Sequence, residues 1–151
     1  MRKIFCTLVL LAFATPLLAS DPFVGTWTLN SAKTKYTTGA PPKNVTIVIE
    51  EQGANLQVTA TGTNSDGSPI SVKYTVPTKG GMGTVLQGDF DGISAKQIST
   101  HVRENSYMKG GKEIRSRRMV VSEDGKTMKS TLKGTGVTGQ PAAGVDFYDK
   151  Q

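Results

Sequence analysis

The residue types on which catalysis and metal binding depend are scarce in this 151-residue chain. It has one histidine, His101, and one cysteine, Cys6, which lies in the apolar N-terminal segment. Zinc sites with paired histidines are therefore excluded, as is a thiol nucleophile downstream of that segment. Asp89 and Asp91 stand beside Gly92, where carboxylates cap turns more often than they bind calcium or transfer protons. We expect no catalytic residue, no metal site and no cofactor, and we expect that the protein is not an enzyme.

Positive charge is modest and spread along the chain. The formal net charge is +6, Arg2 and Lys3 belong to the N-terminal segment, and no basic run is longer than Arg117–Arg118. Nucleic-acid binding calls for a clustered basic stripe with interleaved aromatic residues, which the sequence lacks. We therefore expect no nucleic-acid partner.

The first twenty residues have the three parts of a secretory signal peptide. Residues 1–3 are a short basic start, residues 4–18 are an apolar run, and Ala19 and Ser20 are small residues suited to cleavage. The apolar run is short for a spanning helix, and no second run of that length follows. We predict a signal peptide at residues 1–20 and one domain at residues 21–151. Export without any cysteine in the mature chain indicates a bacterial periplasmic or secreted protein.

Apolar and polar residues alternate through the rest of the chain. Residues 56–61 and 70–76 alternate as half-buried strands do, and glycine turns such as Asp66–Gly67, Gly110–Gly111 and Asp124–Gly125 separate neighbouring runs. Asp91–Gly92 also has the composition of a tight hairpin. No segment shows sustained helical periodicity. The pattern predicts an all-β domain.

The lengths of the connections favour a barrel over a sandwich. Almost every link is a tight hairpin, which indicates up-and-down order, whereas a Greek-key sandwich requires long crossings. Closing such a sheet removes both exposed edges and encloses a lumen for one small ligand. We predict a single up-and-down antiparallel β-barrel of about 8–10 strands.

Gly25 and Trp27, in the first expected strand, resemble the Gly-x-Trp pattern of lipocalins. The chain is also similar to a group of exported bacterial lipocalin-like proteins. The further residues that carry this similarity are Asn30, Ala32, Lys33 and Tyr36, the Gly/Pro-rich segment 39–42, the run 120–128 and the C-terminal segment 145–151. The ten-stranded fatty-acid-binding proteins are an equally fair structural comparison.

This resemblance implies a calycin-type barrel with structural roles for Gly25 and Trp27. In the family, the tryptophan packs at the closed end of the barrel against an arginine from a late strand. Arg118 is the candidate for that arginine. The long C-terminal helix of secreted animal lipocalins is missing from the sequence.

Three side chains are candidate ligand contacts: Tyr74, Tyr107 and Arg118. Tyr74 shares strand parity with Ile70, Val72 and Val76, which places it inward, either as a core residue or as a ligand contact. Tyr107 shares a face with Arg103 and His101, and neither face of its strand is clearly apolar.

Arg118 shares a face with Ile114 and Val120, which predicts that it points into the barrel. An inward arginine needs a partner, and two partners are possible for Arg118. Arg118 either stacks on Trp27 or binds the anionic head group of a ligand. The other arginines, Arg103, Arg115 and Arg117, are expected on a solvated outer face.

The expected function is noncatalytic binding of a small, largely apolar molecule in the lumen of a monomeric, exported barrel. Such a ligand carries an anionic head group if Arg118 binds it. One alternative is a structural or partner-binding module of the cell envelope that uses an outer face or the loop 31–43. The other is an enzyme with Tyr74, His101 or an arginine in its pocket. A lumen filled by the chain's own side chains would count against ligand binding.

Overall fold

The computed structural model describes residues 20–151, so the predicted signal peptide (residues 1–20) lies outside the described residues except for Ser20. Residues 20–151 form strands joined by turns and loops, with no helix among them. Within this range, therefore, no helix is long and apolar enough to cross a membrane. The predicted all-β class is confirmed.

The strands follow the alternating segments and the glycine turns of the sequence. Gly110 and Gly111, for example, link two strands with φ angles of 58° and 76°, the left-handed conformation that a two-residue hairpin requires. The strands are β1 (Gly25–Leu29), β2 (Lys35–Thr38), β3 (Asn44–Gln52), β4 (Asn55–Thr63), β5 (Pro69–Pro77), β6 (Gly81–Met82), β7 (Thr84–Gln87), β8 (Gly92–Ser99), β9 (Val102–Lys109), β10 (Lys112–Val121), β11 (Thr127–Thr135) and β12 (Pro141–Lys150).

All strand pairs are antiparallel, in the order β6-β8-β9-β10-β11-β12-β1-β3-β4-β5-β7. The two ends of this order, β6 and β7, are separated in the chain only by Gly83. Because β6 pairs with β8 and β7 pairs with β5, this interrupted strand nearly closes the sheet into a barrel. With β6 and β7 counted as one strand, the meander has ten members, as predicted. The expected tight hairpin at Asp91–Gly92 is wrong, since β7 pairs with β5 instead of β8.

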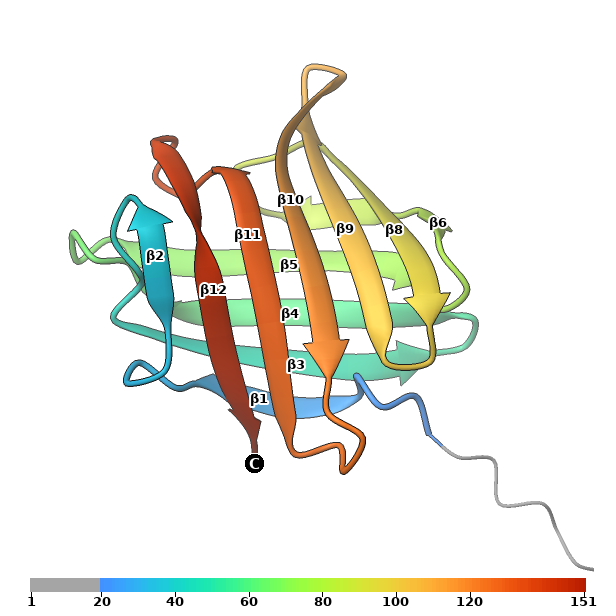
Figure 1. The fold of residues 1–151 in the computed structure, drawn as a ribbon. Coiled ribbons are helices and arrows are strands. Elements are labelled where there is room, and N and C mark those ends of the chain that lie inside the picture. Colours follow the sequence, from blue (N-terminus) through green and yellow to red (C-terminus); the bar gives the residue numbers. More distant parts are fainter. Residues whose placement is uncertain (1–19) are drawn as a thin grey trace, which may run out of the picture.

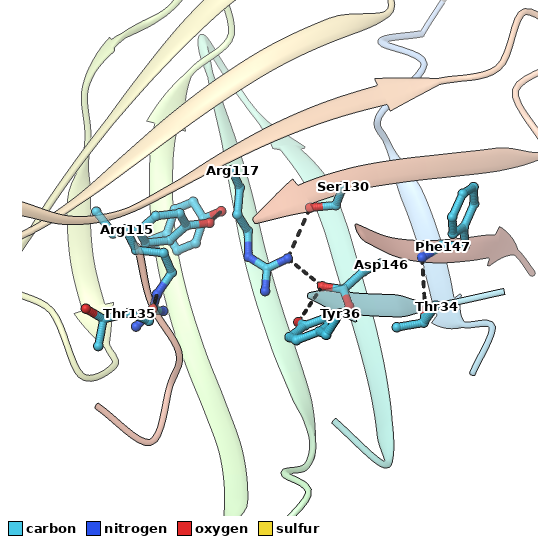
Figure 2. Close-up of polar contacts among 10 residues, drawn as sticks. Thr34, Tyr36, Arg115, Arg117, Ser130, Thr135, Asp146 and Phe147 are labelled. Atoms are coloured by element: carbon cyan, nitrogen blue, oxygen red, sulfur yellow. Dashed lines mark hydrogen bonds and ion pairs between the residues drawn. The ribbon is translucent and has the colours of Figure 1, made fainter. Parts of the chain in front are cut away.

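One edge of β12 is shared between β1 and β2. β1 pairs with residues 148–150 of β12, and β2 pairs with residues 143–145. Between them, Phe147 accepts a hydrogen bond from the N–H of Asn30 at 2.7 Å and donates its own N–H to Thr34 Oγ1 at 3.1 Å (Figure 2). The loop between β1 and β2 thus continues the hydrogen-bond ladder where the strand is interrupted.

The barrel is flattened into two curved layers (Figure 1). Strands β8 to β12, coloured yellow to red, form the front layer, and β1, β3, β4 and β5 run across them behind. Alternate side chains of each strand point into the space between the layers. The core and the cavity described below occupy this space.

Trp27 is packed where the N-terminal segment enters the barrel. Its side chain is fully buried, and its Nε1–H donates to the carbonyl oxygen of Phe23 at 2.8 Å. Phe23, Trp27 and Leu29 are all buried, which confirms the predicted shared face of this segment. Gly25 has a φ of 137°, a backbone conformation that favours glycine, and a Cβ there would also displace the end of the Lys150 side chain.

The cation beside Trp27 is Lys150, and the expectation of an arginine from a late strand is wrong. Lys150 Nζ lies 5.0 Å from the centroid of the indole ring. Arg118 instead pairs with Glu104 on the outer surface, where the two side chains are 49% and 42% exposed. Lys150, the last residue of β12, therefore occupies the position beside Trp27 that we expected for Arg118.

Replacing Trp27 with Phe should lower the free energy of unfolding by about 2–3 kcal/mol. The variant leaves the Phe23 carbonyl without its donor and leaves a void beside a fully buried ring. The measurement is urea unfolding followed by circular dichroism. Thr28→Ser, at the exposed neighbouring position, is the control and should change stability by less than about 0.5 kcal/mol. Equal effects of the two changes would contradict this role for Trp27.

Candidate functional site

A cavity of about 590 Å³ lies between the two layers. Each of β3, β4 and β5 turns its apolar positions toward it, as the alternation of the sequence requires. The apolar residues that these strands contribute are Val45, Ile47, Ile49, Leu56, Val58, Ala60, Ile70, Val72 and Val76. The chain's own side chains therefore leave the lumen partly open.

Residues of three connections also line this cavity: those between β2 and β3, β4 and β5, and β11 and β12. The connections are neighbours. A Cβ on Gly39 would lie 3.0 Å from the carbonyl oxygen of Pro141, and the N–H of Lys43 donates to the carbonyl of Thr63 at 2.9 Å. We call this group of connections the mouth. It lies at the first residue of β12, opposite the Lys150 end where Trp27 packs.

Two of the three predicted ligand contacts, Tyr74 and Tyr107, meet inside the barrel. Both line the cavity, and their hydroxyl oxygens are 3.2 Å apart. Phe90 makes edge-to-face contacts with both rings, with centroid separations of 6.0 and 5.0 Å, which hold the rings in place. Asn105 donates its Nδ2–H to the Tyr74 hydroxyl at 3.1 Å. These three polar residues, Asn105, Tyr74 and Tyr107, are called the Asn–Tyr cluster below.

Arg117 on β10 points into the cavity, although we expected it on the outer face (Figure 2). Its Nη1 donates to Asp146 Oδ2 at 2.7 Å and to Ser130 Oγ at 3.1 Å. Asp146 is fully buried, and it also accepts the Tyr36 hydroxyl at 3.3 Å. Gly144 makes room for Tyr36, because a Cβ there would lie 2.3 Å from Cδ1 of its ring. Four strands thus contribute to one polar wall of the cavity.

The protonation states around this wall follow from burial and from Asp146. Burial, then the Asp146 carboxylate, raises the pKa of Tyr36 to about 12. Burial likewise raises the pKa of Tyr74 and of Tyr148 well above the usual value. Burial lowers the pKa of Arg117, but Asp146 and the neighbouring tyrosines together raise it more, and the net pKa is well above normal. At neutral pH, therefore, these tyrosines are neutral hydrogen-bond donors and Arg117 is charged.

Arg103 and Arg115 are also buried, which corrects the expectation that they are solvated. Arg103 pairs with Asp21 at 2.7 Å and stacks over the ring of Phe23, 5.3 Å from its centroid. It also donates to a backbone carbonyl at 2.5 Å. Arg115 pairs with Asp89 and lies over the Tyr107 ring, again at 5.3 Å. Both cations are held by a carboxylate and an aromatic face.

Arg118, the third predicted ligand contact, does not line the cavity. On β10 the buried residues are Arg115, Met119 and Val121, and the half-buried Arg117 shares their parity, so the inward face is the opposite of the one we predicted. This face is inward because Asp89 and Asp146 supply carboxylates to its arginines. In the sequence, the apolar pair Met119 and Val121 indicated this inward face, but Ile114 and Val120 make the opposite face look equally apolar.

The remaining candidates for chemistry lie apart from the cavity. His101 is in the turn between β8 and β9 and does not line the cavity. Asp91 accepts the N–H of Gly110 at 2.8 Å, so it caps the distant turn between β9 and β10 and not the turn beside Gly92 where we expected it. Asp89 holds Arg115 instead of capping a turn. Among residues 20–151, no three His, Cys, Asp or Glu side chains come together as a metal site would require.

What the arrangement offers chemically is an apolar cavity with a few polar groups along one wall, all held in place by hydrogen bonds and ion pairs. Such a lining can hold and orient a small molecule. Comparisons of the chain with protein-family models, with curated proteins and with solved structures each gave no match. The site is therefore interpreted from its own geometry.

Two neighbouring arginines should respond very differently to replacement. Arg117→Met leaves the fully buried Asp146 without its cation and should lower the free energy of unfolding by about 3–5 kcal/mol. Arg118→Met breaks an exposed pair and should cost less than about 1 kcal/mol. Chemical unfolding of both variants measures the difference. Equal losses, or a larger loss for Arg118→Met, would overturn the assignment of the inward face.

Alkaline pH should destabilise the barrel. The pKa of Tyr36 is about 12 in the folded state and about 10 in an unfolded chain. Between these two pH values, Tyr36 keeps its proton in the folded state and loses it in the unfolded state. The contribution is fully present below about pH 10 and is lost as the pH rises through about 12. Urea unfolding across this window, with tyrosinate absorbance, measures the decline. Tyr36→Phe should make the decline shallower, and an unchanged slope in that variant would refute the assignment.

Proposed function

We propose that this protein is an exported, noncatalytic binding protein that holds a small, largely apolar molecule in the lumen of its barrel. The observation that carries this function is the cavity of about 590 Å³ with apolar walls. Small-molecule sites commonly enclose about 300–1,000 Å³ and combine apolar walls with a few placed polar groups. The size and lining of the cavity suit a compact lipid or a hydrophobic metabolite.

The barrel type and the location of the protein belong to the same proposal. A ten-membered meander with Gly25 and Trp27 at the end opposite the mouth supports a lipocalin or fatty-acid-binding type of barrel. The basic start, apolar run and small residues of segment 1–20 support export to the periplasm or the medium. A monomeric protein is part of the proposal, because the cavity needs no second chain to complete its lining.

A structural or partner-binding role in the cell envelope is the alternative. Such a role would use an outer surface, where Met82 and Leu86 are 66% and 55% exposed. It does not require an open lumen, and partner-binding barrels can fill theirs with side chains. The open cavity is the reason to prefer ligand binding.

A bulky residue in the lumen should abolish binding, whereas the same residue on the outer face should not. Ala60 lines the cavity, and its neighbour Thr61 is exposed. We expect Ala60→Trp to weaken the binding of a fluorescent apolar probe by at least about tenfold, and Thr61→Trp to leave it unchanged. Fluorescence titration of the purified mature protein measures both. Failure of the wild-type protein to take up the probe would remove the proposed function.

The same pair of variants identifies what the protein carries in its host. Organic extraction followed by mass spectrometry should find one enriched apolar molecule with the wild-type protein and with Thr61→Trp. Ala60→Trp should have lost it. A molecule that remains with all three proteins does not reside in the lumen.

A further inference from the structure

The charges around the cavity cancel in pairs. The wall contains three arginines, and each holds a carboxylate: Arg103 holds Asp21, Arg115 holds Asp89 and Arg117 holds Asp146. Among the described residues, no lysine lines the cavity. At the mouth, hydrogen bonds from Ser68 lower the pKa of Asp66 and keep it ionised. The lining in residues 20–151 therefore holds no uncompensated positive charge.

All three arginines already hold a carboxylate, and Arg117 shows why such a paired cation is a poor site for an anionic ligand. Asp146 lies 2.7 Å from the guanidinium and is fully buried, so it cannot turn away to solvent. A carboxylate that approached Arg117 would also face the charge of Asp146, and like charges in a poorly solvated site repel strongly. Arg117 is thus already occupied by an internal anion.

Two cavity-lining side chains of the described residues keep buried polar atoms without a partner: Arg103, through Nε and Nη1, and Asn105. The Arg103 atoms are donors on a guanidinium that already holds Asp21, whereas Asn105 offers an acceptor. Asn105 is 3% exposed, and its Nδ2 donates to Tyr74, but its Oδ1 is buried and has no partner. Tyr74 and Tyr107 share one hydrogen bond, which uses one of their two hydroxyl hydrogens. The other hydroxyl hydrogen has no partner among the described residues. The Asn–Tyr cluster therefore has one free acceptor and one free donor at the cavity wall.

We propose that the ligand is uncharged and carries a hydroxyl group on an apolar body, and that this hydroxyl binds the Asn–Tyr cluster, an inference that rests on the binding function proposed above. The ligand hydroxyl donates to Asn105 Oδ1 and accepts from the free tyrosine hydroxyl. It satisfies both open groups at once, whereas an unpaired buried acceptor costs about 1–3 kcal/mol.

Three ligands with the same apolar chain separate this inference from its rivals. 1-Decanol both donates and accepts, decyl methyl ether only accepts, and decanoate is a charged acceptor. Each is titrated against the probe-loaded mature protein at about pH 8, where the carboxyl group is ionised. We expect 1-decanol to bind at least about tenfold more tightly than decanoate, with the ether between them.

Two variants assign the preference to the Asn–Tyr cluster. Asn105→Leu removes the free acceptor and should reduce the alcohol-to-ether affinity ratio to within about threefold of one. Tyr107→Phe removes a hydroxyl from the same cluster and should reduce the ratio in the same direction, which covers the case in which Asn105→Leu does not fold. Ser106→Ala, the adjacent residue that faces away from the cavity, is the matched control and should keep the wild-type ratio.

The outcomes distinguish the two proposals. Tightest binding by decanoate, equal affinities for the three ligands, or a ratio unchanged in both cluster variants would overturn the neutral hydroxyl ligand while leaving lumen binding in place. Failure of the probe and of all three ligands to bind the wild-type protein would overturn lumen binding itself.

Discussion

A cation can enter the interior of this barrel only if an anion accompanies it, and much of the structure follows from that constraint. Three buried or half-buried arginines on β9 and β10 each recruit a carboxylate from a distant part of the chain. One comes from the N-terminal segment, one from the connection between β7 and β8, and one from β12. The ion pairs therefore tie together segments that the backbone ladder joins only through intermediate strands.

This constraint also shapes what the cavity can hold. Because the internal carboxylates neutralise the arginines, the polar wall is rich in hydrogen-bonding groups and poor in net charge. In the binding function proposed above, the apolar side, formed by β3, β4 and β5, accommodates the body of the ligand, and the polar side orients one group of it. An arginine inside a barrel does not by itself make an anion site, since its effect depends on what already holds it.

Local sequence patterns predicted the architecture well because the forces that set it are local. Alternation identified the strands, and glycines such as Gly110 and Gly111 marked hairpins that need positive φ. The inward positions of Tyr74 and of the strand around Trp27 followed from parity. Parity did not identify the inward face of β10, because both faces of that strand mix arginine with apolar residues. The inward face of β10 depends on the ion pairs with Asp89 and Asp146, which are far from β10 in sequence.

The pairing of β1 with β12 affects the order in which the barrel folds. Trp27 lies opposite Lys150 in the ladder, so β1, which pairs with β3 on one side, gains its other neighbour only when residues 148–150 are present. Contacts of such long sequence separation form late and slowly, because the intervening chain must be ordered before they are gained. The barrel therefore cannot close before β12 has been synthesised. This late closure would suit the export proposed above, in which the chain is threaded through a membrane before it folds.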